Sequence, residues 1–200
     1  MKELLEIIDN SDEPVYELNA YIKQLKIVNK QDVAWDILKE IALNGNLKQR
    51  FVALTIISIN KPFYLEALSI ELIKNQNFAE IEQILIPIIC ICSVVEKEEH
   101  IGFMLEVLDY AFRNNKKYLW KITLRNILIT NYWIKIKDKI AEIVSNSDNI
   151  TIIDLFAFFM YEHGKSEYDR FVGCLPQNEQ SKIIKLETNI MKRKKDFYQR

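Results

Sequence analysis

The stretch EEHIGFMLEVLDYAFRN (Glu98–Asn114) indicates the fold class, because its apolar residues follow the period of an α-helix. They stand at positions i, i+3, i+4, i+7, i+10 and i+11, and are Ile101, Met104, Leu105, Leu108, Ala111 and Phe112. This spacing places them on one face of a helix. Around Lys135–Val144 the apolar side is Trp133, Ile136, Ile140, Ile143 and Val144, and Lys135, Asp138, Lys139 and Glu142 lie opposite. Both stretches predict amphipathic helices.

The composition extends this expectation to the whole chain. Among 200 residues, Gly and Pro occur only 4 times each, where average usage predicts about 24 in total. A β-sandwich or barrel turns roughly every 8–12 residues and needs more of both. The glycines are scattered, which also excludes a glycine-rich phosphate loop. We therefore expect an all-α fold.

Polar turns divide the chain into about 11–12 predicted helices. The helices are expected at residues 2–9, 14–29, 32–44, 47–59, 63–75, 78–94, 98–114, 117–130, 133–145, 150–163, 166–172 and 177–198. Capping residues separate them at Asn44–Asn46, Asn60–Pro62, Ser145–Asn149 and His163–Gly164. Pro87 lies inside the sixth helix and predicts a kink, because proline lacks a backbone donor and clashes with the preceding turn.

The predicted helices alternate in character along the chain. Those that start near residues 47, 82, 117 and 150 are apolar around much of their circumference, whereas those near 32, 63, 98 and 133 are amphipathic. A two-helix unit that repeats about every 34 residues is typical of an α-solenoid. The alternative is an irregular helical bundle in which the spacing is accidental.

Two of the apolar segments, LKQRFVALTIISIN (Leu47–Asn60) and YLWKITLRNILITN (Tyr118–Asn131), resemble the inner helices of HEAT-type repeats. The resemblance covers roughly residues 32–163, although the proline of the first HEAT helix is mostly absent, as is a regular Asp/Arg ladder. It implies a right-handed α-solenoid of about four to five HEAT-like helix pairs. The expected organisation is one domain, residues 1–200, with capping helices at 1–31 and 164–200 around repeat units at 32–163.

Charge is grouped along the chain, although 27 basic and 28 acidic residues give a net charge of only −1. Residues 51–110 hold 3 basic and 9 acidic side chains, and residues 111–140 hold 8 and 1. The predicted helix 98–114 and the turn before it carry an acidic strip, which consists of Glu96, Glu98, Glu99, Glu106 and Asp109. Such a strip suits a basic partner. An ordinary solvated helix face is the alternative interpretation.

The basic block Arg113–Lys139 contains interleaved aromatic residues, a combination that can contact phosphates and stack on bases. Trp120 and Trp133 fall on apolar stripes and are assigned to the core. Tyr132, Lys135 and Lys139 share one face. We predict this basic and aromatic face as a second partner-binding surface.

Two charged residues interrupt apolar stretches in successive apolar helices, Arg125 and Asp154. A buried carboxylate requires hydrogen-bond donors. We therefore predict a structural ion pair between Arg125 and Asp154. A general base or a substrate-binding carboxylate at Asp154 is the alternative.

Neither a metal site nor a cofactor site is expected, and no residue is assigned as catalytic. The side chains of Cys90 and Cys92 diverge by about 200° on a helix and cannot share an ion. His100 and His163 stand at a helix start and a helix end, which favours capping or surface roles. The longest apolar run, Ile84–Val95, has 12 residues, fewer than the roughly 18 that span a bilayer, so it predicts a buried helix.

These observations favour a non-enzymatic protein-binding module. Its most concrete form is an immunity protein that binds and blocks a cognate bacterial toxin domain, such as a nuclease. The expected partner is a protein, for instance a basic toxin domain, and neither a nucleic acid nor a membrane. Three cysteines, an odd number, favour a reducing, cytoplasmic location.

Two other functions remain open. HEAT-like alkylpurine DNA glycosylases resemble this chain in architecture and in having Trp and Asp as candidate groove residues. That resemblance implies a DNA-binding enzyme, which would need a basic groove. The third possibility is a structural subunit that oligomerises through the apolar stripe of Lys182–Tyr198.

Overall fold

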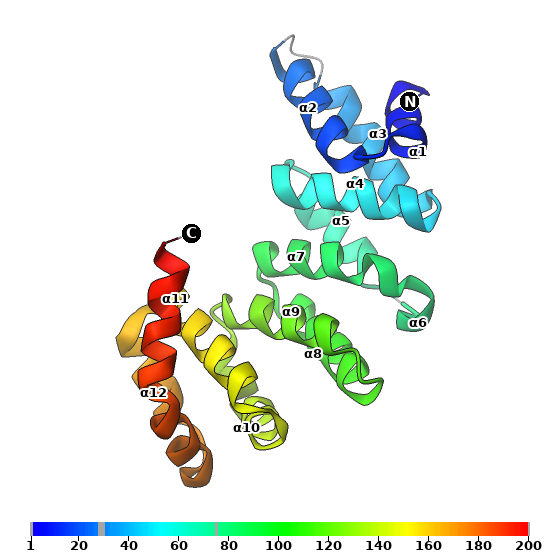
Figure 1. The fold of residues 1–200 in the computed structure, drawn as a ribbon. Helices are drawn as coiled ribbons and strands as arrows, with labels where there is room; N and C mark the ends of the chain where they lie inside the picture. The colour runs from blue at the N-terminus through cyan, green and yellow to red at the C-terminus, as the bar shows by residue number, and fades with distance from the viewer. Residues whose placement is uncertain (1, 28–30, 75, 200) are drawn as a thin grey trace. The chain divides into compact units, whose positions relative to one another are not determined.

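The computed structural model describes residues 2–27, 31–74 and 76–199, and every regular element in these ranges is a helix (Figure 1). The all-α prediction is confirmed. Residues 28 and 29 of the predicted helix 14–29, and residue 75 of the predicted helix 63–75, lie outside the described residues.

The chain divides into two compact units, Met1–Lys116 and Lys117–Arg200. This division falls between the helices predicted at 98–114 and 117–130. It does not coincide with the predicted limits at residues 31 and 164, and the organisation into caps and repeats stays a prediction.

In unit 1, helices that are close along the chain pack in pairs (Figure 1). Its elements are α1 (Lys2–Asn10), α2 (Pro14–Ile27), α3 (Gln31–Asn44), α4 (Leu47–Asn60), α5 (Leu65–Leu72), α6 (Phe78–Ile81), η1 (Glu82–Ile84), α7 (Leu85–Val95) and α8 (Glu98–Arg113). α4 contacts α1, α2, α3 and α7, while α7 also contacts α5 and α8. The core of unit 1 is therefore centred on α4 and α7.

Unit 2 is built around a long pair of helices, α11 and α12. Its elements are α9 (Lys117–Leu128), η2 (Trp133–Ile136), α10 (Lys137–Asn146), α11 (Asn149–Gly173) and α12 (Gln177–Tyr198). α9 packs on α11, and α10 packs on α12. Trp133, Phe156, Phe159 and Phe171 form an aromatic core cluster with ring centroids 4.7–5.6 Å apart.

Helix ends lie where the capping residues predict them. Asn46 and Gln49 form a capping box at the start of α4, and Asp148 accepts a hydrogen bond from the Thr151 backbone N–H at the start of α11. Gly164 has φ 83° and interrupts α11, because this left-handed conformation is one that glycine adopts without steric cost. The break predicted after His163 is therefore confirmed.

The predicted helix 78–94 is interrupted near Pro87, as expected. The 3-10 segment η1 separates α6 from α7, and Pro87 lies in the first turn of α7, where a missing backbone N–H leaves no hydrogen bond unmade. By length and composition alone, Phe78–Val95 is the one segment of the described chain that could cross a membrane. Half of its residues are buried inside the fold.

The apolar stripe of α12 is used within the chain. Ile183 and Ile190 are fully buried, and α12 packs along α11. The oligomerisation helix proposed for Lys182–Tyr198 would need the same stripe, so the structure argues against that third possibility.

Candidate interaction surfaces

The acidic strip lies on α8 and on the turn before it. Glu98, Glu99 and Glu106 are exposed, whereas Glu96 and Asp109 are half-buried. The opposite side of α8 is buried through Ile101, Met104, Val107, Leu108 and Ala111. The first turn of α8 contains Glu98 and Glu99, where carboxylates are favoured by the helix dipole. The structure thus presents the predicted strip on the outer side of an amphipathic helix.

Two further carboxylates of unit 1, outside the acidic strip, form ion pairs with lysines. Glu66 forms an ion pair with Lys97, and this hydrogen bond lowers the pKa of Glu66. Glu82 accepts hydrogen bonds from Lys116 at 3.0 Å and from the Tyr110 hydroxyl at 2.9 Å, and both lower the pKa of Glu82. These two carboxylates are therefore partly neutralised by their partners.

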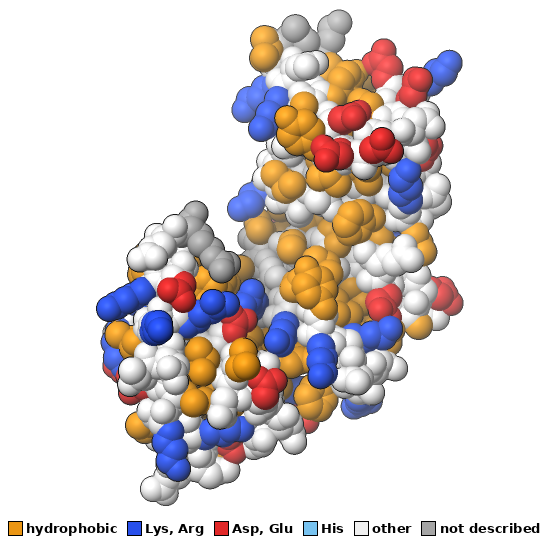
Figure 2. Space-filling model, viewed as in Figure 1, with side chains coloured by type: hydrophobic (Ala, Val, Ile, Leu, Met, Phe, Trp, Pro, Cys, Tyr) orange, Lys and Arg blue, Asp and Glu red, His pale blue; other side chains and the backbone are white. Residues whose placement is uncertain are grey.

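The outward sides of α4 and α7 carry apolar residues. We define the open face as Phe51, Thr55 and Ile59 of α4 with Ile86, Cys90 and Val94 of α7, at four-residue spacing on each helix. Phe51, Ile59 and Val94 are 40%, 55% and 41% exposed, and Figure 2 shows hydrophobic side chains gathered over both helices. The Thr55 hydroxyl donates to the Phe51 carbonyl at 2.7 Å, so part of its polarity is satisfied within the helix.

Sequence reasoning missed the open face. Both helices are apolar around much of their circumference, and this pattern predicts burial. The residues of the open face are themselves spaced four apart, which is the signal that could have revealed a separate side.

The basic and aromatic face lies at η2 and α10. The Lys135 ammonium stands over the Tyr132 ring, 5.0 Å from its centroid, while Lys139 forms an ion pair with Glu142 at 3.0 Å. Tyr132 and Lys139 are half-buried, and Lys135 is exposed. The structure thus brings Tyr132 and Lys135 together, and it partly neutralises Lys139.

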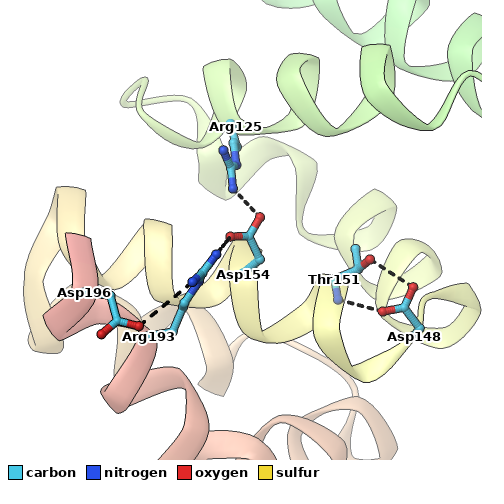
Figure 3. Close-up of polar contacts among 6 residues, drawn as sticks. All are labelled: Arg125, Asp148, Thr151, Asp154, Arg193 and Asp196. Atoms are coloured by element: carbon cyan, nitrogen blue, oxygen red, sulfur yellow. Dashed lines mark hydrogen bonds and ion pairs between the residues drawn. The ribbon is translucent and has the colours of Figure 1, made fainter. Parts of the chain in front are cut away.

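Arg125 and Asp154 meet in an ion pair between α9 and α11 (Figure 3). A third residue, Arg193 of α12, approaches the other carboxylate oxygen of Asp154 at 3.7 Å. The Asp154 side chain is only 18% exposed, so its charge is mostly shielded from water and depends on these cations. Sequence reasoning did not connect Arg193 with Asp154. It missed that Arg193 falls between Ile190 and Phe197, inside the apolar stripe of α12.

These charged residues line a cleft of about 630 Å³ in unit 2. Its lining includes the basic residues Lys121, Arg125 and Arg193, the acidic Asp154, and the apolar Ile150 and Phe197. α9, α11 and α12 each supply part of this lining. The cleft is therefore positively charged on balance, with an apolar wall.

The histidines and cysteines occupy different environments. His100 is fully buried, so the capping or surface role predicted for it is wrong; neither of its ring nitrogens has a hydrogen-bond partner, and burial lowers its pKa. The His163 Nε2 atom makes a hydrogen-bond contact with the Leu128 carbonyl oxygen. Burial raises the pKa of the Cys90 and Cys92 thiols, which makes them poor nucleophiles.

Within residues 2–27, 31–74 and 76–199, no group of three or more His, Cys, Asp or Glu side chains is arranged to hold a metal ion. The chain matches no protein-family model, and comparisons with curated proteins and with solved structures gave no match.

Proposed function

We propose that this chain is a non-enzymatic protein-binding module whose contact surface is the open face of α4 and α7 together with the acidic strip of α8. The observation that carries the proposal is the apolar character of the open face. The outward side of a helix in a soluble protein is normally polar. A contiguous apolar surface in that position marks an interaction site, because covering it removes apolar area from water.

The charge of unit 1 defines the partner's chemistry. Unit 1 contains 12 basic and 18 acidic residues, a net charge of −6. Glu96, the C-cap residue of α7, is two residues after the exposed Val94, so the open face and the acidic strip are adjacent along the chain. A partner with an apolar centre and a basic rim complements both parts, and the opposite charges accelerate its association.

In this proposal, the helices of the chain form a right-handed solenoid of HEAT-like pairs. It is supported by the first residues of α4, α7, α9 and α11, which are 32 to 38 residues apart. Within unit 1, α4 and α7 each pack against helices that precede and follow them. A repeat of this kind presents the outward sides of successive inner helices on one surface.

The most concrete version of the proposal is an immunity protein that acts in the cytoplasm. A nuclease toxin needs a basic surface to bind its phosphate-rich substrate. An acidic surface with an apolar centre can cover such a site and exclude the substrate. The partner would then be a basic toxin domain.

The test uses the purified product of the adjacent gene, with its activity disabled, as the binding probe in calorimetry. We expect Ile59→Lys and Val94→Lys each to weaken binding at least tenfold, because each adds a cation to an apolar contact that faces a basic partner. The control is Ile184→Lys, which changes an exposed isoleucine of α12 in unit 2. Lack of binding, or an equal loss in the control, overturns the proposal. Circular dichroism verifies that each variant is folded.

A second candidate, a DNA-binding enzyme of the alkylpurine DNA glycosylase type, is favoured by unit 2. This unit contains 15 basic and 10 acidic residues, a net charge of +5, and its basic cleft holds a carboxylate. Phosphate contacts of this kind make binding weaken steeply with salt. Absence of duplex DNA binding at low salt would eliminate this candidate.

A further inference from the structure

The cleft of unit 2 has an excess of positive charge. Lys121, Arg125 and Arg193 contribute three cations to its lining, and Asp154 contributes a single carboxylate. We propose that this cleft binds a phosphate monoester attached to an aromatic group, a ligand of the size and chemistry of a mononucleotide. This inference goes beyond the protein-binding function and does not depend on it.

The two arginines retain donors for an anion. Arg125 gives one terminal guanidinium nitrogen to Asp154; its Nε–H has no acceptor but is buried, so the donors left for a ligand are those of its terminal nitrogens. The contacts of Arg193 with Asp154 and Asp196, at 3.7 and 3.9 Å, are longer than the roughly 2.7–3.2 Å of a hydrogen bond. Each guanidinium also carries five N–H groups. The donors are therefore not exhausted by the contacts within the chain.

Aromatic rings orient both arginines. The Arg125 guanidinium stands 5.3 Å from the centroid of Phe158, and that of Arg193 stands 5.8 Å from the centroid of Phe197. A ring contact uses the planar face of a guanidinium and leaves its N–H edge for hydrogen bonds. Asp154 contacts both arginines and acts as a positioning residue, because it holds them close together against their mutual repulsion (Figure 3).

The charge balance favours a monoester over a diester or a single carboxylate. Near neutral pH a phosphate monoester carries a charge of about −1.5 to −2 and three acceptor oxygens. This charge matches the three cations less one carboxylate of the cleft lining; Asp196 lies outside the lining and stands 3.9 Å from Arg193. A diester or a carboxylate carries one negative charge and leaves part of the positive charge uncompensated.

The apolar wall fits the aromatic part of such a ligand. Ile150 is 78% exposed at the cleft, and Phe197 is held by Phe158 and Tyr161, with ring centroids 6.1 and 5.8 Å away. The cleft volume of about 630 Å³ lies within the range of about 300–1,000 Å³ that is typical of small-molecule sites. A base can therefore lie against this wall while its phosphate meets the cations.

Calorimetry with the full chain tests the ligand chemistry. The probes are AMP, adenosine and 3′,5′-cyclic AMP, which share one base and differ in phosphate charge. We expect AMP to bind, adenosine not to bind, and cyclic AMP to bind about tenfold more weakly, equivalent to about 1.4 kcal/mol. The proposal is overturned if AMP does not bind, or if adenosine binds as tightly as AMP.

Variants test the position of the site. Lys121→Gln and Arg193→Gln should each weaken AMP binding about tenfold, because each removes a charged hydrogen-bond donor. Lys185→Gln, an exposed position of α12 outside the cleft lining, is the matched control and should bind as the natural chain does. Equal weakening in the control overturns the assignment. Tighter binding of duplex DNA or of a polyglutamate peptide than of AMP, lost in Arg193→Gln, also overturns it and indicates a macromolecular ligand.

Discussion

His100 is buried in unit 1 at the start of α8, and its environment makes stability depend on pH. Burial lowers its pKa, and Lys97 adds to this effect, while Glu99 and Glu66 partly oppose it. The unfolded chain therefore binds a proton on His100 at a higher pH than the folded chain does. Consequently the free energy of unfolding falls as pH decreases below the ordinary histidine value of about 6.5. We expect urea unfolding to show this loss between about pH 7 and pH 5.5.

The variant His100→Leu should remove most of that pH dependence, because leucine has no proton to gain. His163→Gln is the control, because it removes the other histidine of the chain. The ring of His163 contacts the Leu128 carbonyl oxygen, whereas the ring nitrogens of His100 have no hydrogen-bond partner. Glu66 and Glu82 have lowered pKa values and lose their ion pairs only at more acidic pH. An unchanged loss of stability in His100→Leu would contradict the prediction.

Replacement of glycine by alanine should change the stability of the chain in opposite directions at two positions. Gly102 is exposed in the interior of α8, and an added Cβ meets nothing within 4 Å. Gly102→Ala should therefore stabilise the chain by about 0.5–1 kcal/mol, the usual difference between these residues in a helix. At Gly45 an added Cβ would lie 2.7 Å from the Ile41 carbonyl oxygen, so Gly45→Ala should destabilise it. Thermal unfolding measures the midpoint temperature of each variant, and equal shifts in the two variants would contradict the prediction.

At the scale of helices, Asp154 connects α11 with α9 and α12. Its replacement by Asn keeps the shape but leaves Arg125 and Arg193 together without a countercharge. We expect Asp154→Asn to lower the free energy of unfolding by about 2 kcal/mol. The exposed pair Arg170 and Glu167 is the control, and Glu167→Gln should cost less than about 0.5 kcal/mol. Urea denaturation measures both, and equal costs would show that Asp154 is not a structural link.

Local sequence predicted most helix ends, because capping depends on residues within one turn. Asn46 and Gln49 form the capping box of α4, and Gly164 takes a positive φ of 83°, which glycine favours, and interrupts α11. The third member of the charged cluster could not be predicted in this way. Arg193 is 39 residues from Asp154, and only the packing of α12 on α11 brings them together.

The exposure of the outward side of α7 could not be predicted from local sequence either. Hydrophobic periodicity detects a helix with one apolar side, but α7 is apolar on its buried side and on much of its outward side. Such a sequence predicts full burial. Which side remains uncovered depends on how many neighbouring helices pack against it, and this is a property of tertiary structure.

At the scale of the whole molecule, the two compact units differ in charge, −6 for unit 1 and +5 for unit 2. The grouping of charge could be predicted from the sequence, because it follows from the numbers of basic and acidic residues in each part of the chain. The place of the division could not, because the turn between α8 and α9 resembles the other polar turns of the chain. This difference assigns the two proposed ligands, a basic protein and a phosphate monoester, to different units.

The division at Lys116 predicts where a protease cuts first. A compact unit resists cleavage inside itself because many contacts must open locally, whereas the turn between the units has only its own hydrogen bonds and the Lys116–Glu82 ion pair to open. Arg113, Lys116 and Lys117 are exposed around Asn115, which has φ 55°. Brief trypsin treatment should therefore yield fragments close to residues 1–116 and 117–200, identified by mass spectrometry. Lys165 is the internal control, because it is exposed beside Gly164 but lies within unit 2, where α11 packs along α12. Cleavage at Lys165 before cleavage at Arg113–Lys117 would mean that the chain does not open between the two units.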